Sequence, residues 1–410
     1  MAVPKLRFKE FSEDYNFSKF QEASIQIIDG DRGNNYPKSD DFYDNEYCLF
    51  LNAGNVTKSG FKFESTQFIN KEKDALLRKG KLQKNDLVIT TRGTVGNIAY
   101  FDESIPFENI RINSGMVIVR SEIDLEPIYL NQFLKSDLFE KWLEKNVFGS
   151  AQPQLTVKLL NSISISYPSK EEQTKIASFL SAVDEKISQL TEKHALLSQY
   201  KQGMMQKLFS QQLRFKADDG SEFGEWETTT LGQTGKFIGG GTPSKENSEF
   251  WEGSIPWISS SDLTEESIFK INITRFISQN ALNQSATKLV PANSILIVSR
   301  VGVGKVAITP NEICTSQDFT SLTLHKGSSI FFAYLIKSLT PYLLEMNQGT
   351  SIKGFIKDDL ANLELKIPCI EEQTKIANFL SAIDQKIEVV AQQIEQAKTW
   401  KKGLLQQMFV

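Results

Sequence analysis

Histidine and cysteine are scarce in this chain of 410 residues, which contains 2 His and 3 Cys. These five ligands cannot build two Cys/His zinc sites, and a single four-ligand site would use nearly all of them. Cys48, Cys314 and Cys369 are odd in number and far apart in the sequence. That pattern argues against a disulfide framework and favours a reducing compartment.

Long apolar segments and an excess of positive charge are also missing. The longest apolar run, 330–336, is too short to cross a bilayer, and Lys5, Arg7 and Lys9 interrupt any leader-like start. We therefore expect a cytoplasmic protein that does not contact a membrane. The formal net charge of -4 argues against a uniformly basic nucleic-acid binder, although it leaves room for local basic patches.

No catalytic motif stands out in the sequence. A phosphate-binding loop around 302–305 would need Gly at position 299 and Ser or Thr at 306, where this chain has Ser299 and Val306. No Asn-Pro-Pro-aromatic or Asp-Pro-Pro-Tyr segment for base amino-methylation is present, and neither His194 nor His325 lies beside a nucleophile signature. We therefore expect no catalytic residue, no metal site and no enzymatic activity.

The chain contains an internal repeat with an offset of 200 residues. The segment 171–177 recurs as 371–377, and 171–210 is identical to 371–410 at 18 of 40 positions. Upstream the likeness is weaker, yet the tetrapeptide Leu-Arg-Phe-Lys occurs at both 6–9 and 213–216. Such self-similarity is typical of a duplicated architecture. We therefore predict two variable modules that alternate with two repeated segments, with domains at 1–150, 151–215, 216–350 and 351–410.

The repeated segment predicts a long helix. Its apolar residues alternate at spacings of four and three for more than four heptads, which is the a/d seam of a coiled coil. We assign the seam to Ile176, Leu180, Val183, Ile187, Ile376, Leu380, Ile383 and Ile387. Two such seams in one chain most simply form an antiparallel pair, roughly 50 Å long at 1.5 Å per residue. The alternative is that each helix packs only on its own module.

The variable modules predict an α+β fold. Buried strands are expected at 86–91, 116–119, 294–299 and 321–324, and helices at 126–146 and 329–347. We expect twisted, mostly antiparallel sheets in both modules. The predicted architecture is therefore two globular modules that alternate with two paired long helices, related by an internal pseudo-twofold axis.

Basic residues gather near the predicted turns of both modules. Arg92 and Arg300 each precede a Gly-rich turn at matching places in the two modules. Lys side chains in such loops suit phosphates, whereas Arg, Asn, Gln and Ser suit base edges. Our candidates for DNA contact are Lys79, Lys81, Lys84, Arg92, Asn97, Lys245, Ser260, Arg300, Lys305 and Gln317. For any single residue the alternative is a solvated charged surface.

The repeat also preserves polar residues that an apolar seam does not require. A common partner that meets both copies would explain them, and on that basis we predict docking residues at Gln173, Lys175, Asp184, Lys186, Gln373, Lys375, Asp384 and Lys386. The alternative is helix capping and local salt bridges.

These motifs together resemble a known family. Each repeated segment begins Pro-x-x-Glu-Glu-Gln-Thr-Lys-Ile, and the second module carries Gly-Gly-Thr-Pro-Ser at 240–244 and Ile-Pro-Trp-Ile-Ser-Ser-Ser-Asp-Leu at 255–263. In these features the whole chain resembles a specificity subunit of a type I restriction–modification system. The first module departs from the pattern, because Phe-Leu-Asn-Ala-Gly-Asn stands at 50–55 in place of the Trp-Ile-Ser-Ser-Ser-Asp segment.

The resemblance implies a division of labour. Each module would be a target recognition domain that reads one half of a bipartite double-stranded DNA target. The helices would set the spacer and dock two methyltransferase (M) subunits, and restriction/translocase (R) subunits would complete the assembly. S-adenosylmethionine, ATP and Mg would belong to those partners, so we expect no cofactor in this chain. The alternatives are a non-catalytic scaffold for protein or polysaccharide, and a DNA methyltransferase or nuclease in its own right.

Overall fold

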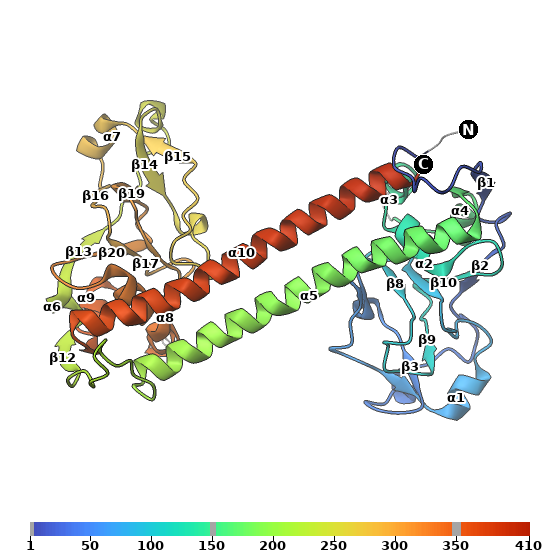
Figure 1. The fold of residues 1–410 in the computed structure, drawn as a ribbon, viewed down its shortest axis with the longest axis horizontal. Coiled ribbons are helices and arrows are strands. Elements are labelled where there is room, and N and C mark those ends of the chain that lie inside the picture. The colour runs from blue at the N-terminus through green and yellow to red at the C-terminus, as the bar shows by residue number, and fades with distance from the viewer. Residues whose placement is uncertain (1–3, 148–152, 347–353) are drawn as a thin grey trace. The chain divides into compact units, whose positions relative to one another are not determined.

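The computed structural model describes residues 4–147, 153–346 and 354–410 and divides into two compact units. The first unit comprises Met1–Thr191 with Gln392–Val410, and the second comprises Glu192–Ala391. Each unit holds one variable module and a part of each long helix, α5 (Lys170–Phe209) and α10 (Ile370–Met408) (Figure 1). The predicted boundaries near 150 and 350 lie outside the described residues, and the division into four domains stays a prediction.

The first module is built on a four-stranded antiparallel sheet in the order β2-β10-β7-β8. These strands are Ile25–Asp29, Met116–Ser121, Leu87–Thr90 and Ile98–Tyr100, which confirms both strands predicted for this module. Both faces of the sheet are buried, which is why its strands read as nearly continuous apolar runs. Leu87 and Ile89 join a core with the helices, whereas Val88 between them joins a core on the opposite face.

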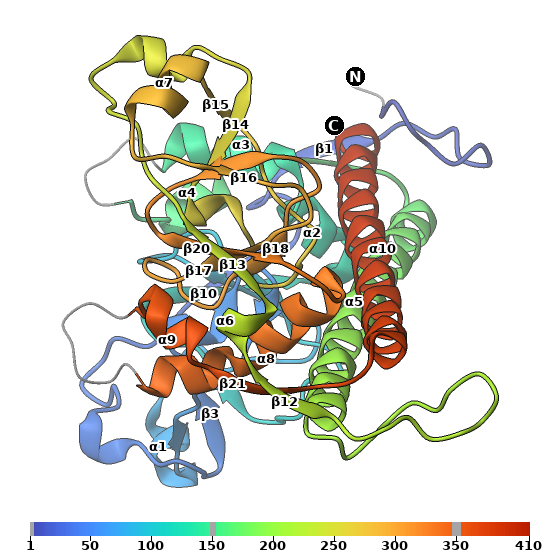
Figure 2. The ribbon, with the colours of Figure 1, turned by 90° about the vertical axis from the view of Figure 1, so that its left-hand side faces the viewer.

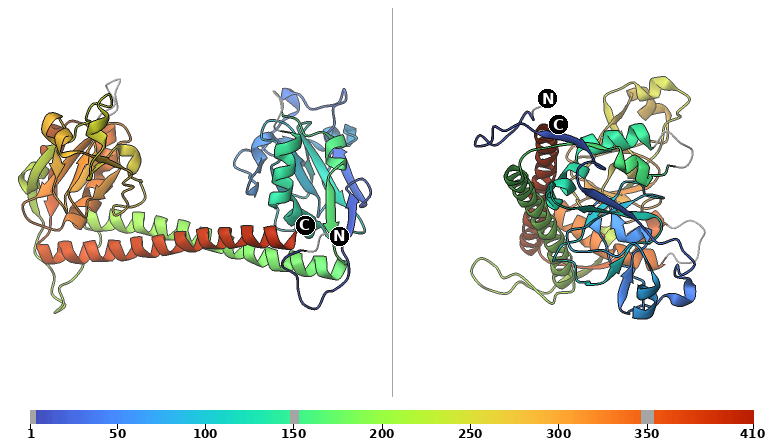
Figure 3. Two further views of the ribbon diagram at one scale, coloured as in Figure 1. Left: turned by 90° about the horizontal axis from the view of Figure 1, so that it is seen from above. Right: turned by 90° about the vertical axis from the view of Figure 1, so that its right-hand side faces the viewer.

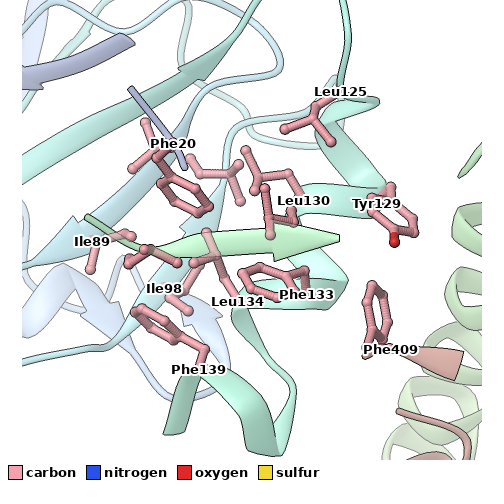
Figure 4. Close-up of a cluster of buried hydrophobic side chains, with 14 of the residues drawn as sticks. Phe20, Ile89, Ile98, Leu125, Tyr129, Leu130, Phe133, Leu134, Phe139 and Phe409 are labelled. Atoms are coloured by element: carbon pink, nitrogen blue, oxygen red, sulfur yellow. The ribbon is translucent and has the colours of Figure 1, made fainter. Parts of the chain in front are cut away.

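Helices α2 (Pro127–Leu134) and α3 (Asp137–Asn146) cover one face of this sheet. Figure 4 shows Ile89 and Ile98 of the sheet close to Phe133 and Leu134 of α2. We predicted one helix over 126–146, and this is wrong in detail, because the chain breaks between α2 and α3. Ser136 there has extended backbone angles (φ -81°, ψ 159°) as the residue before α3.

The other face is covered by a smaller sheet in the order β6-β3-β9. Its strands are Phe68–Ile69, Cys48–Phe50 and Ile110–Arg111. β3 pairs with β6 in antiparallel fashion and with β9 in parallel fashion. The expectation of mostly antiparallel sheets is therefore confirmed, with one parallel pair in this module.

The second module repeats this topology. Its main sheet has the order β13-β20-β17-β18, and its smaller sheet has the order β15-β14-β19-β16 with β14 and β19 parallel (Figure 2). The main strands are Gly235–Gly239, Phe319–Leu324, Ile295–Val298 and Val306–Ile308, which confirms the two predicted there. The smaller strands are Arg275–Ile277, Ile255–Ile258, Ile313–Thr315 and Leu289–Val290. Modules with little sequence in common thus share one fold.

The remaining elements also recur as pairs. A single helix α8 (Ser329–Met346) takes the place of α2 and α3, and the predicted end at 347 lies outside the described residues. Each module is closed by a two-stranded antiparallel sheet and a short helix that lead into the long helix. These are β1 (Asn16–Lys19), β11 (Ser164–Tyr167) and α4 (Val157–Asn161), then β12 (Glu227–Thr230), β21 (Glu364–Ile367) and α9 (Lys357–Ala361).

Shorter elements complete the modules. The hairpin β4 and β5 belongs to the first module, and the helices α1, α6 and α7 each have one or two turns. Their bounds are Val56–Thr57, Gly60–Phe61, Lys71–Leu76, Leu231–Thr234 and Gln279–Gln284. Turns of 3₁₀ helix occur at Ser39–Asp41, Ala53–Asn55, Ser248–Trp251 and Ser260–Asp262.

The two long helices pair within each unit as an antiparallel coiled coil. In the first unit the beginning of α5 packs with the end of α10 against the module, and Tyr129 of α2 faces Phe409 with their ring centroids 5.0 Å apart (Figures 3 and 4). In the second unit the end of α5 packs with the beginning of α10. The predicted pairing is confirmed, and all eight assigned seam residues are buried or half-buried. The alternative of helices that pack only on their own modules is wrong, since both cores contain residues of both helices.

Candidate nucleic-acid interface

Four loops of the second module meet at one edge of its sheets. They follow β13, β14, β17 and β19 and span 240–246, 259–262, 299–305 and 316–318, and we call them the second loop cluster. Backbone hydrogen bonds join them: the amide of Gly241 donates to the carbonyl of Thr315, and that of Ser316 to Ile258, each at 2.8 Å. The amide of Ser299 donates to the carbonyl of Asp318, also at 2.8 Å. These hydrogen bonds therefore join the loops into one surface.

The first module has the equivalent surface around its loop 91–97. The amide of Thr91 donates to the carbonyl of Gly115 at 2.7 Å, as that of Ser299 does to Asp318. The carbonyl of Thr91 accepts from the amide of Leu155 at 3.1 Å, and that of Ser299 accepts from Phe355 at 2.9 Å. Arg92 and Arg300, the next residues in each chain segment, therefore occupy equivalent places in the fold.

Glycines shape both of these arginine-bearing turns. Gly96 and Gly304 have φ angles of +89° and +107°, which L side chains rarely adopt. A Cβ at Gly96 would lie 2.6 Å from a methyl group of Leu143, and a Cβ at Gly304 would lie 2.8 Å from a methyl group of Thr340. Both turns thus pass tightly over a helix of their module, and this close approach accounts for the Gly pattern in the sequence.

In the second loop cluster the structure brings together several of the predicted residues. Arg300 is exposed and has no ion-pair partner in the part of the chain that the structure describes. Lys305 donates from Nζ to the backbone carbonyl of Ser260 at 3.0 Å, so the two candidates are neighbours. Gln317 accepts a hydrogen bond from the Thr242 hydroxyl and is exposed. Lys245 is also exposed, on the loop that follows β13.

In the first module three predicted residues have partners within the fold. Lys81 forms an ion pair with Asp74 at 2.6 Å, and Lys84 donates to the carbonyl of Asp102 at 2.7 Å. The Asn97 side-chain amide donates to the carbonyl of Val56 at 3.0 Å and is half-buried. Lys81, Lys84 and Asn97 thus each have a partner within their own module, and their contact with DNA stays a prediction.

The Asp74 carboxylate binds both Lys81 and Arg111. Burial alone would raise the pKa of Asp74, but hydrogen bonds from Lys81 and Arg111 outweigh burial and lower it. Of the basic candidates in this module, Lys79 and Arg92 remain exposed and have no ion-pair partner among residues 4–147 and 153–191.

A turn of 3₁₀ helix follows β3 and β14 at equivalent places, although its residues differ. The backbone amide of Ser259 donates to the Asp262 carboxylate at 2.7 Å, and that of Asn52 donates to the Asn55 side chain at 2.9 Å. Sequence reasoning missed Arg275, which binds Asp262 and lies over the Trp257 ring, with its guanidinium carbon 4.7 Å from the ring centroid. The first-module segment 50–55 thus forms the same turn as the second module but carries different side chains on it.

Two of the predicted docking residues are buried glutamines. Gln173 and Gln373 are 1% and 5% exposed. Each donates to the carbonyl of a preceding proline, at 3.0 Å for Gln173 to Pro168 and 2.9 Å for Gln373 to Pro368. Each also accepts from a backbone amide of its module. The prediction that they meet a partner is wrong, because they fasten the start of each long helix to its module.

The repeated aspartates join the two long helices. Asp384 is 8% exposed and pairs with Lys201 of α5 and the Tyr334 hydroxyl, so its prediction as a docking residue is also wrong. Burial raises the pKa of Tyr334, and the charge of Asp384 raises it further. Asp184 makes the equivalent pair with Lys401 of α10 and remains 38% exposed at its side chain.

The repeated lysines differ in their surroundings. Lys175 and Lys375 form surface ion pairs with Glu10 and Asp218. Lys186 and Lys386 are exposed and have no ion-pair partner among the described residues. Of the preserved polar set, these two lysines are the clearest remaining candidates for contact with a partner.

Within 4–147, 153–346 and 354–410, no three His, Cys, Asp or Glu residues gather so that they could hold a metal ion. Over the same residues, no helix combines the length and apolar character that crossing a bilayer requires.

Two modules of one topology, which present different loop surfaces on a shared pair of helices, define a two-module recognition protein. Residues 24–198 and 224–399 each match the family described as the type I restriction modification DNA specificity domain. The chain belongs to this family and is a specificity subunit of a type I restriction–modification system. The prediction made from the repeated motifs is confirmed, and the alternatives of a scaffold and of an independent methyltransferase or nuclease are not favoured.

Individual relatives agree with this family. The chain is 32% identical to the MjaIX specificity subunit of Methanocaldococcus jannaschii over 40% of its own length and 39% of that protein. It is 27% identical to the putative MjaX specificity subunit of the same organism over 77% of this chain and 75% of that protein. It is 23% identical to the HindI specificity subunit of Haemophilus influenzae, with 83% of this chain and 89% of that protein covered.

Solved structures share the fold. A crystal structure of the S subunit from M. genitalium covers 100% of this chain and 99% of its own, with a TM-score of 0.62 at 16% identity. A chain from a study of assembly and conformational transition in the type I R-M system covers 96% of this chain and 97% of its own, with a TM-score of 0.59 at 18% identity. These likenesses extend over both modules and both long helices.

Proposed function

We propose that each module reads one half of a bipartite target in double-stranded DNA. The observation that carries this proposal is the pair Arg92 and Arg300. Both side chains are exposed on turns at equivalent places of the two modules, and their surroundings differ. An exposed arginine fork suits guanine in the major groove, where it makes two parallel hydrogen bonds.

The neighbouring residues divide into those that suit bases and those that suit phosphates. In the second module Gln317 and Ser260 belong to the second loop cluster, as Arg300 does, and offer hydrogen bonds to base edges. Lys245 in that module and Lys79 in the first suit the backbone, where a lysine acts as a point charge. Because the exposed residues around Arg92 and Arg300 differ between the modules, the two half-sites should differ in sequence.

The paired helices are proposed to set the spacer between the half-sites. α5 is one continuous helix of 40 residues, which corresponds to about 60 Å. Half-sites on one face of a duplex have centres near one turn, about 34 Å, apart. The ion pairs Lys201–Asp384 and Lys401–Asp184 fix the register of the two helices, a task that polar seam residues commonly perform.

The helices are also proposed to dock two methyltransferase subunits. Lys186 and Lys386 offer matching exposed charges, and Tyr200 and Trp400 offer matching exposed rings at 52% and 54%. Exposed aromatic residues are frequent anchors of protein interfaces. Methyl transfer and cleavage, with S-adenosylmethionine, ATP and Mg, are assigned to the M subunits and the restriction/translocase subunits.

The spacer proposal is tested by one heptad inserted into each long helix, after Leu190 and after Val390. Each insertion adds about 10 Å of helix, so the recognised spacer should lengthen by up to about three base pairs while both half-sites stay the same. The measurement is the methylation pattern produced with the partner subunits.

The matched control is a seven-residue insertion after Gly220, in an exposed turn where a Cβ would have no neighbour within 4 Å. It lengthens the chain but neither helix, so the spacer should not change. A half-site altered by the heptads, or a spacer altered by the control, would refute the helices as the spacer device.

A further inference from the structure

A cleft of about 550 Å³ opens in the first unit beside the loop that carries Arg92. Residues 95–98 of that loop form one wall, the start of α3 forms another, and the last turns of α10 form a third. Its floor is apolar, with Leu134, Phe139 and Leu405 among the lining residues. The cleft is therefore continuous with the surface proposed to read the first half-site.

Lysines dominate the polar lining of this cleft. Five line it, Lys58, Lys135, Lys398, Lys401 and Lys402, together with the three acids Asp137, Glu140 and Asp184. This leaves an excess of two positive charges in a chain whose formal net charge is -4. A concave surface of one sign with apolar walls concentrates ions of the opposite sign.

The acids of the cleft neutralise few of these lysines. Lys401 is taken by Asp184, and Lys398 pairs with Glu395 at 3.0 Å outside the cleft lining. Lys58, Lys135 and Lys402 have no ion-pair partner among the described residues. Three ammonium groups thus line the cleft without forming an ion pair with a described residue.

The surroundings of Lys135 reflect this crowding of charge. Its side chain remains exposed at the cleft, yet desolvation by the surrounding protein lowers its pKa. The charge of Lys401 lowers that pKa further, and Asp184 opposes the effect. An anion in the cleft would relieve the repulsion between these two lysines.

The second unit repeats only part of this charge, because Lys337 lies near Lys201 as Lys135 lies near Lys401, but the other helix lysines have no counterpart. At the positions 200 residues earlier, Lys398 and Lys402 are replaced by Ser198 and Gln202. The equivalent of Lys401 is Lys201, which is buried against Asp384. The excess of positive charge on the helix is thus a property of the first unit rather than of the repeated framework.

We propose that this cleft holds a backbone phosphate of the DNA strand that flanks the first half-site. The proposal rests on the proposed function, because it takes the loop with Arg92 to read that half-site. Lysine ammonium groups suit phosphate as point charges, and such contacts position a protein on the duplex without reading sequence. The second half-site would lack this contact.

The test is the double variant K398S/K402Q, which replaces both lysines of α10 by the residues at the equivalent positions of α5. The control is K193Q, since Lys193 is an exposed helix residue and its repeat position holds Gln393. The full chain with its methyltransferase partner is titrated with target and random duplexes at several salt concentrations. Ethylation of single DNA phosphates then maps which of them binding requires.

The double variant should lower the slope of log affinity against log salt concentration by about 0.9, the value for one phosphate contact, and equally for both duplexes. The ethylation map should lose a phosphate beside the first half-site only, and K193Q should match the unchanged chain. An unchanged slope and map in the double variant would overturn the cleft proposal alone. An unchanged chain that does not prefer its target over random duplex would instead overturn the proposed function.

Discussion

The two halves of this chain keep the same framework and differ at the surfaces proposed to meet DNA. Arg7 binds Glu172 at 2.7 Å, and Arg214 binds Glu372 at 2.8 Å, which explains the repeated Leu-Arg-Phe-Lys tetrapeptide. Even a backbone bond recurs, from Leu6 to Gln407 at 3.0 Å and from Leu213 to Lys207 at 3.1 Å. Identity between the halves therefore marks mostly the framework, and differences in specificity are to be sought in the unlike residues around Arg92 and Arg300.

Within the framework the two interhelical ion pairs differ in burial. Lys201 and Asp384 are 7% and 8% exposed at their side chains, whereas Lys401 and Asp184 are 13% and 38% exposed. A buried carboxylate that loses its partner keeps its desolvation cost, but a carboxylate near the surface regains water. Loss of the lysine from each pair should therefore lower the free energy of unfolding by a different amount in the two units.

The largest expected effect in this comparison is that of Lys201→Ala. It leaves Asp384 buried beside Tyr334 and should lower the free energy of unfolding by about 3–5 kcal/mol. Lys401→Ala should cost below about 1 kcal/mol, because Asp184 is partly exposed. Chemical denaturation followed by circular dichroism measures both.

The double variant Lys201→Met/Asp384→Leu is the control for the loss of a charge. It removes both charges but also the acceptor of the buried Tyr334 hydroxyl, so it should recover a part of the stability that Lys201→Ala loses. Equal losses for Lys201→Ala and Lys401→Ala would show that burial does not separate the two units.

A smaller effect, on the free energy of DNA binding, is expected from replacing Arg92 or Arg300. Arg300→Ala should cost about 1–3 kcal/mol for DNA with the correct second half-site and should leave discrimination at the first half-site intact. Arg92→Ala should show the opposite pattern. Binding of the assembled enzyme to duplexes with one changed half-site measures each loss.

Lys245→Ala serves as the comparison for a residue that contacts only phosphate. It should weaken binding to all duplexes alike and reduce the salt slope by about 0.9. If Arg300→Ala gave this uniform pattern, Arg300 would be a phosphate contact and the assignment of base reading to it would be wrong.

Much of the fold followed from local patterns in the sequence. The strands at 86–91 and 294–299 are buried on both faces, so their apolar runs were informative, and the heptads predicted both long helices. The break at Ser136 was not predicted, because an apolar helical pattern continues across it. The parallel pairs β3-β9 and β14-β19 join segments far apart in the sequence, and local patterns do not determine such pairings.

The candidate site was predicted less completely, for a physical reason. The equivalence of Arg92 and Arg300 was predictable, because the Gly turn beside each depends on local backbone geometry. The commitment of Lys81 to Asp74 and the burial of Gln173 were not predictable, because these contacts depend on tertiary packing. Repetition alone cannot distinguish a residue kept for the framework from one kept for a partner.

Two modules that read two different half-sites at a constant separation should leave a distinct pattern of methylation. The decisive measurement is a map of methylated bases in the genome of cells that carry this chain and its partner subunits. We expect one target with two unlike half-sites and a spacer of constant length. Arg300→Ala should relax the sequence requirement at only one of the two half-sites. A continuous target, or a spacer that varies from site to site, would contradict bipartite reading by the two modules.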